Sequence, residues 1–256
     1  MKILIKIGGT LLDSAMSRGR LAAEIGAVAN AGAPCVVVHG GGKQMTRFLA
    51  ERGIESRFID GLRVTTPEVL DAVLKVLAGS VNRELVAAFI AAGVLAVGLT
   101  GMDALTTEAE PLSAELGAVG KPVSANPALL RTLLEHGYTP VVACVAGDRG
   151  GHFYNVNADQ MAVACAVALE VDQLFFLTDV EGVRGRDQAI LGSLTPGECG
   201  TLIQEKVAID GMRTKLEAAM DALTRSVDQV VIAPGAVAGV VQRLVSGQPI
   251  GTRLRA

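Results

Sequence analysis

Short apolar segments alternate with helix-length amphipathic segments along nearly the whole chain, and this alternation limits the possible folds more than any other feature. The apolar segments are hydrophobic on both faces, which is typical of strands in a parallel sheet covered by helices on both sides. The predicted strands are Ile3–Ile7, Cys35–Val38, the end of Ala91–Leu99, Pro140–Ala146, Asp172–Leu177 and Gln229–Ile232. The predicted helices are Arg20–Ala31, Lys43–Arg52, Pro67–Leu77, Pro127–His136, Asp159–Glu170 and Lys215–Thr224.

Two segments interrupt this regular pattern. Thr106–Pro122 is predicted to form a hairpin or an excursion over a substrate site, and Val183–Pro196 a loop or short hairpin. A lobe boundary is predicted near Glu170, because the strand that follows it begins a new series of strands and helices. The two predicted lobes are residues 1–170 and 171–256.

Composition restricts the class of protein. The chain has 256 residues, of which 50% are hydrophobic, so it can bury a large core and is not disordered. A net charge of -3, an aromatic content of 3% and the absence of Trp argue against a nucleic-acid partner. The longest uncharged apolar stretch, Val86–Met102, is interrupted by Gly93 and Gly98 and is shorter than a membrane span of about 20 residues, so no membrane partner is expected.

Cysteine usage indicates the compartment. The four cysteines, Cys35, Cys144, Cys165 and Cys199, form no C-x-x-C pair, so neither a zinc site nor a redox dithiol is expected. The apolar stretch at the start of the sequence is too short, and is interrupted by glycine too soon, to resemble a signal peptide. The sequence therefore predicts a cytoplasmic protein.

Glycines and polar residues follow three of the predicted strands. They are Gly8-Gly9 after Lys6, the glycine triplet Gly40–Gly42 after His39, and Thr178-Asp179. Ligands of open α/β sheets bind beyond the carboxyl ends of strands, and glycines there let backbone N–H groups approach an anion. One glycine pair alone is more often a tight turn, but three such turns favour a phosphate or carboxylate site. The P-loop and dinucleotide-binding patterns are both missing.

Three further polar positions each have a functional and an ordinary interpretation. Lys6, near the end of an apolar strand, either faces an anion or extends to solvent. The polar residues of Asn155–Asp159 exceed what a helix N-cap needs, although Asp159 could cap a helix. Lys215, expected in the first turn of a helix, would oppose the helix dipole unless an anion lay nearby; otherwise it is a solvated charge.

Eight short motifs, in this order along nearly the whole chain, resemble those of the amino-acid kinase family. Each motif alone is weak to moderate evidence, whereas the full set in family order is specific. Two of them, Gly61–Thr65 and Asn155–Asp159, point to the branch that acts on N-acetyl-L-glutamate. The motifs are KIGG (Lys6–Gly9), VHGGG (Val38–Gly42), GLRVT (Gly61–Thr65), ELGAVG (Glu115–Gly120), NVNAD (Asn155–Asp159), TDVEGV (Thr178–Val183), DGMRTK (Asp210–Lys215) and GTR (Gly251–Arg253).

The resemblance implies a fold and a reaction. The fold is an open αβα sandwich with a mainly parallel sheet and two lobes, the N-terminal one for the amino-acid substrate and dimerisation and the C-terminal one for ATP. The reaction is transfer of the γ-phosphoryl group of ATP to the side-chain carboxylate of N-acetyl-L-glutamate, in a route to arginine. Mg²⁺ is expected to arrive with the nucleotide, with no protein metal site, and the protein is expected to be a homodimer.

The resemblance also implies roles for individual residues. Lys6 and Lys215 would grip the phosphoryl group, and Asp159 would orient both lysines. Because the acceptor carboxylate is already ionised at neutral pH, no general base is needed. The substrate would bind to Gly41 and Gly42 through backbone N–H groups, to Arg63 through its α-carboxylate and to Asn155 through its acetyl-amino group. The nucleotide would lie against Gly8, Gly9, Thr178, Asp179, Val180, Glu181, Gly182, Val183, Val207, Ala208, Ile209 and Met212.

One departure from the family pattern leaves the acceptor open. Many relatives have a lysine where this chain has Met102, within Gly98–Asp103. Kinases of N-succinylglutamate or of carrier-linked aminoadipate are therefore alternatives. A non-catalytic sensor and a nicotinamide oxidoreductase are disfavoured by the intact lysines and by the missing dinucleotide motif.

The position of the first predicted strand bears on regulation. Arginine-sensitive hexamers of the family resemble one another in having an additional N-terminal helix, and the strand expected from Ile3 leaves no room for one. The expectation is a homodimer that L-arginine does not inhibit. The helix Pro67–Leu77, with Val69, Val73 and Val76, could belong to the core or to an interface.

Overall fold

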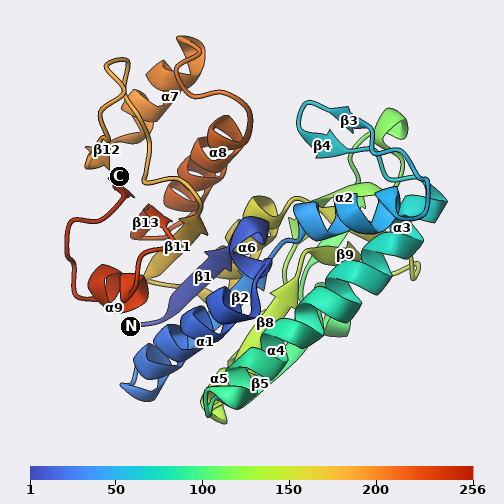
Figure 1. Cartoon of the computed structure of the whole chain (residues 1–256), viewed down its shortest axis with the longest axis horizontal. Helices are drawn as coiled ribbons and strands as arrows, with labels where there is room; N and C mark the ends of the chain where they lie inside the picture. Colours follow the sequence, from blue (N-terminus) through green and yellow to red (C-terminus); the bar gives the residue numbers. More distant parts are fainter. Residues whose placement is uncertain (256) are drawn as a thin grey trace.

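The central feature of the molecule is an eight-stranded sheet, seen in a computed structural model that describes residues 1–255 (Figure 1). The order of strands is β12-β14-β13-β11-β1-β2-β8-β5, and neighbouring strands are parallel except for β13 and β14. The strands are β1 (Ile3–Ile7), β2 (Cys35–His39), β5 (Ala96–Thr100), β8 (Thr139–Ala143), β11 (Gln173–Thr178), β12 (Ser193–Leu194), β13 (Gln229–Pro234) and β14 (Thr252–Leu254).

Burial explains the continuous apolar runs of the inner strands. Every residue of β1, β2 and β8 is buried, so these strands need hydrophobic side chains on both faces. This confirms the α/β sandwich with a mainly parallel sheet that the sequence predicts.

Helices cover both faces of this sheet. Helices α1 (Ala15–Asn30), α4 (Asn82–Ala91) and α9 (Val240–Val245) pack side by side on one face, whereas α6 (Ala158–Leu169) and α8 (Asp210–Thr224) pack together on the other. The chain crosses the sheet in one direction from β1 to β2 and in the other from β11 to β13, so right-handed connections place the two groups of helices on opposite faces. The remaining α-helices are α2 (Gly42–Ala50), α3 (Pro67–Val73), α5 (Ala128–Glu135) and α7 (Pro196–Gln204).

Two smaller sheets lie outside the main one. Strands β6 and β7 pair antiparallel, which confirms the hairpin predicted in Thr106–Pro122, and they close with β9 and β10 into a small barrel. An antiparallel bridge between Arg184 and Ile190 forms the short hairpin expected in Val183–Pro196. The strands are β3 (Phe58–Ile59), β4 (Leu62–Arg63), β6 (Glu108–Pro111), β7 (Val119–Ser124), β9 (Val145–Gly147) and β10 (Phe153–Val156), and short 3-10 turns lie at η1 (Gly9–Leu12), η3 (Asp103–Leu105) and η4 (Ala114–Leu116).

The helix predicted to end at Leu77 continues much further. A π-helical segment, η2 (Leu74–Val81), joins α3 directly to α4, and Val81 keeps helical dihedral angles. The predicted end was wrong because Gly79 costs a helix only about 1 kcal/mol, which the packing of the segment overcomes. Val69, Val73 and Val76 are buried within the chain, so they belong to the core and not to an interface.

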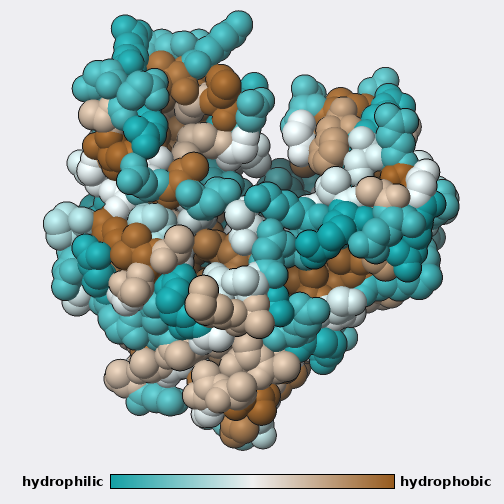
Figure 2. Space-filling view, viewed as in Figure 1, coloured by the Kyte–Doolittle hydropathy of each residue, from teal (hydrophilic) through white to brown (hydrophobic). Residues whose placement is uncertain are grey.

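Strand β1 is the point where the order of strands reverses. Its neighbours are β2 on one side and β11 on the other, so Ile7 lies beside both His39 and Leu177. The three turns after β1, β2 and β11 therefore lie next to each other at the carboxyl ends of these neighbouring strands. This is the switch point where open α/β sheets bind ligands. Figure 2 shows a deep notch above these strand ends, between the elements around α7 and α8 and those around α2 and β3.

No helix within residues 1–255 is both long and apolar enough to cross a membrane. The lobe boundary predicted near Glu170 falls between α6 and β11, and it stays a prediction. The main sheet continues across it, because β11 pairs with β1 along the whole length of β1.

Candidate active site

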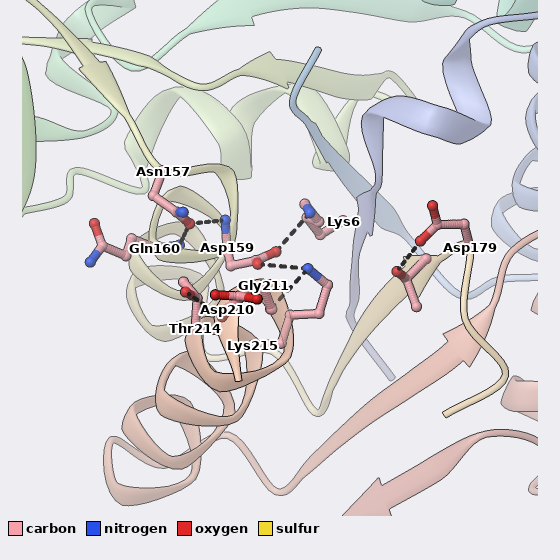
Figure 3. A network of polar contacts seen from close by, with 10 residues as sticks. Lys6, Asn157, Asp159, Gln160, Asp179, Asp210, Gly211, Thr214 and Lys215 are labelled. Carbon is pink, nitrogen blue, oxygen red and sulfur yellow. Dashed lines mark hydrogen bonds and ion pairs between the residues drawn. The ribbon is translucent and has the colours of Figure 1, made fainter. Parts of the chain in front are cut away.

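A buried carboxylate joins two lysines at the switch point (Figure 3). Lys6 Nζ lies 2.7 Å from Asp159 Oδ1, and Lys215 Nζ lies 3.3 Å from Asp159 Oδ2. The three residues come from β1, α6 and α8. The structure therefore brings together the three residues to which the sequence assigned the transfer chemistry.

The charges of this cluster do not cancel. The side chains of Lys6 and Asp159 are 8% and 5% exposed, and that of Lys215 is 16% exposed. Burial raises the pKa of Asp159, but the charges of Lys6 and Lys215 outweigh it and hold the pKa below its ordinary value. Two ammonium groups around one ionised carboxylate leave a net positive charge, which suits a further anion.

The first turn of α6 shows why Asp159 is free for this role. Asn157 is the N-cap: its side chain accepts hydrogen bonds from the backbone N–H groups of Asp159, at 2.8 Å, and Gln160, at 3.3 Å. Because Asn157 caps the helix, the Asp159 carboxylate can pair with the lysines. The sequence suggested Asp159 as a possible cap of this helix, but the cap is Asn157.

The position of Lys215 differs from the expected one. Helix α8 begins at Asp210, so Lys215 lies in its second turn, and the predicted start of this helix was wrong. The argument from an unfavourable helix dipole therefore does not apply to Lys215, since the dipole effect is confined to the first turn. The ammonium group is held by Asp159 and by the carbonyl of Gly211, 3.5 Å away.

The first two glycine turns touch each other. A Cβ atom on Gly9 would lie 3.2 Å from the backbone nitrogen of Gly42 and 3.3 Å from Gly41 Cα, closer than most real Cβ contacts. The Gly8 N–H donates to the carbonyl of Leu177, which ties the same turn to the end of β11. Glycine at position 9 therefore lets the turn after β1 lie directly against the turn after β2.

A cavity of about 180 Å³ opens beside the glycine triplet. It is lined by all four residues assigned to the acceptor substrate, Gly41, Gly42, Arg63 and Asn155. Apolar and small side chains complete its wall: Met45, Phe58, Leu62, Val73, Leu77, Val119, Cys144, Val156 and Ala158.

Arg63 is the cationic group of this cavity. Its Nη2 donates to the Gly42 carbonyl at 3.2 Å and to Thr46 Oγ1 at 2.8 Å, and its Nη1 donates to Ser56 Oγ. Burial lowers the pKa of Arg63, and within residues 1–255 no carboxylate pairs with it. A bidentate contact with a substrate carboxylate would therefore exchange at least one of these hydrogen bonds.

Asn155 reaches the cavity from β10. Its Nδ2 donates to Thr65 Oγ1 at 3.0 Å, and Thr65 in turn donates to the carbonyl of Arg63. Thr65 thus fixes both residues relative to each other. The side-chain oxygen Oδ1 of Asn155 accepts no hydrogen bond from the described part of the chain, so it is available to an amide N–H.

The residues assigned to the nucleotide differ in accessibility. Asp179 accepts hydrogen bonds from Thr10 at 3.1 Å and Thr178 at 3.2 Å. Burial raises its pKa, whereas these bonds and the charge of Lys43 bring it below the ordinary value. Val180 and Ile209 are large apolar side chains exposed to solvent, at 39% and 56%.

Val183 and Ala208, by contrast, are buried in the core. The Val183 N–H donates to Thr252 Oγ1 at 2.7 Å, and the Val183 carbonyl accepts from the Leu191 N–H. Val183 therefore holds the loop after β11 in place. A larger cavity of about 660 Å³ lies along β12 and β14, and none of the predicted site residues lines it.

Sequence reasoning missed several residues at the mouth of the site. An open cavity of about 590 Å³ is lined by Gly9, Gly42 and Arg63 together with Lys43, Thr46 and Arg47. The overlooked signal is Lys43, which follows the glycine triplet and lies in the first turn of α2, where a positive charge opposes the helix dipole. The dipole argument made for Lys215 therefore applies to Lys43.

The positions of the His, Cys, Asp and Glu side chains show whether the described part of the chain could hold a metal ion by itself. Within residues 1–255, no group of three or more His, Cys, Asp or Glu side chains is placed to hold a metal ion. Both oxygens of Asp159 already face ammonium groups. The Asp159 carboxylate is therefore already occupied by its two ion pairs.

A mainly parallel sheet with a cationic cluster at its switch point defines an α/β protein with a site suited to an anionic ligand, and comparison with known proteins gives the family. Residues 1–234 match the sequence profile described as the amino acid kinase family. The chain is 58% identical to an acetylglutamate kinase of Solibacter usitatus (strain Ellin6076), over 99% of both chains. It is 41% identical to an acetylglutamate kinase of Acidobacterium capsulatum, over 97% of this chain and 96% of that one. The protein belongs to the amino acid kinase family.

Solved structures agree with this assignment. An N-acetylglutamate synthase from Neisseria gonorrhoeae, complexed with coenzyme A and N-acetyl-glutamate, superposes with a TM-score of 0.89 at 27% identity. The match covers 100% of this chain but 59% of the synthase chain. A second protein, smu.665 from Streptococcus mutans UA159, superposes with a TM-score of 0.88 at 29% identity, over 100% of this chain and 98% of that one.

Proposed function

We propose that this protein is an ATP-dependent kinase that phosphorylates the side-chain carboxylate of N-acetyl-L-glutamate, in a route to arginine. The observation that carries the proposal is the Lys6–Asp159–Lys215 cluster at the switch point, beside a cavity lined by Gly41, Gly42, Arg63 and Asn155. The names of its close relatives support the same substrate.

The transfer needs positioning and charge neutralisation more than acid–base chemistry. One oxygen of the substrate carboxylate forms a bond to the γ-phosphorus of ATP, the bond from that phosphorus to the β–γ bridging oxygen breaks, and ADP leaves with the electron pair. The carboxylate is ionised at neutral pH, so no proton has to be removed. This agrees with a cluster in which no histidine participates.

Each charged residue of the cluster has a proposed part in this step. Lys6 and Lys215 approach the transferred phosphoryl group and offset the repulsion between two anions. Asp159 fixes both ammonium groups, which makes it a positioning residue. Mg²⁺ bound to the nucleotide would neutralise phosphate charge.

The binding residues orient the acceptor. Arg63 would pair with the α-carboxylate and Asn155 with the acetyl-amino group, while the N–H groups of Gly41 and Gly42 face the reacting carboxylate. On the other side, Gly8, Gly9, Thr178–Val183, Val207–Ile209 and Met212 would receive ATP. The exposed side chains of Val180 and Ile209 offer apolar contacts for the adenine ring.

An acceptor panel tests the substrate assignment. ADP release is measured with N-acetyl-L-glutamate, N-succinyl-L-glutamate, carrier-linked aminoadipate and no acceptor. The highest kcat/KM is expected for N-acetyl-L-glutamate, since Met102, which stands where many relatives have lysine, does not line the cavity. Faster turnover of another acceptor, or ADP release that needs no acceptor, would contradict the assignment.

The protein is further proposed to be a cytoplasmic homodimer without nucleic-acid or membrane partners. All four cysteines are buried and unpaired, which suits a reducing compartment. Strand β5 forms one edge of the main sheet, and the large apolar side chains of Ile90, Leu95 and Tyr138 are exposed near it. An exposed apolar surface beside a sheet edge is suited to a second copy of the chain.

A further inference from the structure

His39 is completely buried at the end of β2, directly before the glycine triplet. The reaction proposed above makes no use of it, and a buried histidine is often only a core residue. Its hydrogen bonds nevertheless form a directed chain that ends at the backbone of the site. Its Nδ1 lies 2.9 Å from the carbonyl oxygen of Gly40, and its Nε2 lies 3.0 Å from the Asn82 side-chain nitrogen.

The partners of Asn82 determine the direction of this chain. Asn82 Nδ2 donates to the Val141 carbonyl at 2.9 Å, and Asn82 Oδ1 accepts from the Arg83 guanidinium. The second hydrogen of the amide nitrogen is therefore directed to His39, so Nε2 must accept it. The single proton of a neutral imidazole then lies on Nδ1 and is donated to Gly40.

The surroundings oppose protonation of His39. Burial lowers its pKa to about 4, although the hydrogen bond to Gly40 acts in the opposite direction, and the positive charge of Arg83 lowers it further. A proton on Nε2 would also point at the amide hydrogens of Asn82. At neutral pH the imidazole is thus neutral and held in one tautomer.

Fixing the Gly40 carbonyl also fixes the next N–H group. No peptide bond in the described chain is cis, so the Gly41 N–H lies in the same peptide plane as the Gly40 carbonyl and points in the opposite direction. Gly41 lines the 180 Å³ cavity, and its N–H donates to no acceptor within residues 1–255. Glycine alone would leave this peptide free to rotate.

The geometry points to His39 as a positioning residue, which, backed by Asn82, orients the Gly40–Gly41 peptide so that the Gly41 N–H faces the reacting oxygen of the acceptor. This inference rests on the proposed function, because it assigns a reacting anion to the glycine turn. A preorganised N–H donor aimed at developing charge is a recognised source of catalysis.

The tautomer can be observed without any turnover. The chain contains three histidines, so ¹⁵N-histidine labelling gives a simple two-bond ¹H–¹⁵N spectrum, in which the His39→Asn variant identifies the signals of His39. We expect a neutral imidazole protonated on Nδ1 from pH 5 to pH 8. A proton on Nε2, or a doubly protonated ring in this range, would overturn the inference even in an enzyme whose substrate proves to be another.

Kinetics test the positioning itself with a matched pair of variants. His39→Leu removes the donor, and kcat with N-acetyl-L-glutamate is expected to fall roughly 10- to 100-fold while the KM for ATP changes less than about twofold. His39→Asn keeps an amide N–H at the place of Nδ1 and is expected to stay within roughly fivefold of the wild-type kcat. The same two substitutions at exposed His136 are the control and should leave kcat unchanged.

The outcomes separate positioning from folding and from the proposed substrate. Rates are taken at a temperature where circular dichroism shows each variant folded. A kcat within twofold of wild type for His39→Leu, or equal losses for His39→Leu and His39→Asn, would overturn the positioning role. A wild-type protein that turns over a different acceptor contradicts the proposed substrate only, and the variants are then compared with that acceptor.

Discussion

Among individual residues, Asp159 has the most demanding environment, because it is buried and yet ionised between two lysines. Removing one partner of a buried charge pair typically costs about 3–5 kcal/mol, since the other charge is left unpaired. Lys6 and Lys215 are therefore fixed in place before any ligand binds. Burial makes the unpaired charges of this cluster costly for the fold. It also strengthens the electrostatic attraction of the two lysines for a phosphoryl group.

Substitution of Lys215 by methionine tests the transfer role. Lys215→Met keeps the length of the side chain and removes its charge, so kcat is expected to fall about 100- to 1,000-fold, with a KM for N-acetyl-L-glutamate within a few-fold of wild type. Initial rates by coupled ADP assay measure both constants. Lys75→Met, at an exposed site on η2, is the control. A folded Lys215→Met enzyme with near-normal kcat would remove Lys215 from the mechanism.

Substitution of Arg63 by lysine tests substrate binding. A lysine cannot form the planar fork of a guanidinium, and it cannot keep all the bonds to Ser56, Thr46 and Gly42. The KM for N-acetyl-L-glutamate is expected to rise at least about tenfold, which corresponds to about 1.4 kcal/mol, and that for ATP much less. Arg131→Lys, on exposed α5, should change neither. Equal changes in both KM values would refute the assignment.

The ionisation of Asp159 predicts a pH dependence of stability. Its pKa is lower in the folded than in the unfolded chain, so ionised Asp159 stabilises the fold fully above its ordinary pKa of 3.8, and this contribution is lost as the pH falls through the lower, folded value. Urea unfolding of wild type and Asp159→Asn should show a difference in free energy that is constant near pH 7 and shrinks below about pH 4. A gap that stays constant down to the acid limit of folding would mean that Asp159 is not the titrating group.

At the scale of helices and strands, the sequence predicts what depends on local pattern and fails where distant packing decides. The apolar run of β1 and the hairpin of β6 and β7 follow from hydrophobicity and turn residues. The start of α8 at Asp210 was missed because Asp210-Gly211 looks like a loop, and Asp210 itself has a positive φ of 46°. The continuous helix through η2 was missed because Gly79 looks like a helix end.

The anchoring of α9 shows what packing adds at this scale (Figure 1). Glu24 on α1 is buried and accepts hydrogen bonds from the backbone N–H groups of Gly239, at 2.8 Å, and Val241, at 3.3 Å, at the start of α9. It also pairs with Arg20, which donates to the carbonyls of Val237 and Gly235. No sequence pattern connects these segments, because a carboxylate of α1 acts as the cap of a helix far along the chain.

Removal of this carboxylate is expected to destabilise the fold. Glu24→Ala leaves two N–H groups of α9 and the guanidinium of Arg20 without their partner, which should lower the free energy of unfolding by about 1.5–3 kcal/mol. Urea denaturation at pH 7 measures the loss. Glu217→Ala, which breaks an exposed i,i+4 ion pair to Arg213, is the matched control and should cost less than about 1 kcal/mol. Equal losses for the two variants would show that the α9 cap contributes nothing beyond a surface ion pair.

At the scale of the whole molecule, the place of the site was predictable, whereas its detailed contacts were not. Turns after β1, β2 and β11 could be expected to meet, because parallel strands share one carboxyl edge. The hydrogen bonds of Arg63 to Thr46 and Ser56, and those of His39 to Asn82, join segments whose spacing carries no signal. Such contacts depend on how α2, η2 and the small sheets pack above the edge.

The final prediction concerns assembly of two chains through the edge strand β5 of the main sheet. Within residues 1–255, strand β5 pairs with β8 alone, and Leu95 and Tyr138 line a surface cavity next to it. Light scattering should give twice the mass of one chain for the wild type, and Leu95→Asp should shift the equilibrium toward the monomer at micromolar concentration, because it places charges in the apolar contact. Val123→Asp, at another exposed apolar side chain, on β7 outside this sheet, is the matched control and should stay dimeric. If Leu95→Asp stays dimeric while Val123→Asp dissociates, the contact between subunits lies on the small barrel, and the edge at β5 is protected from pairing by some other means.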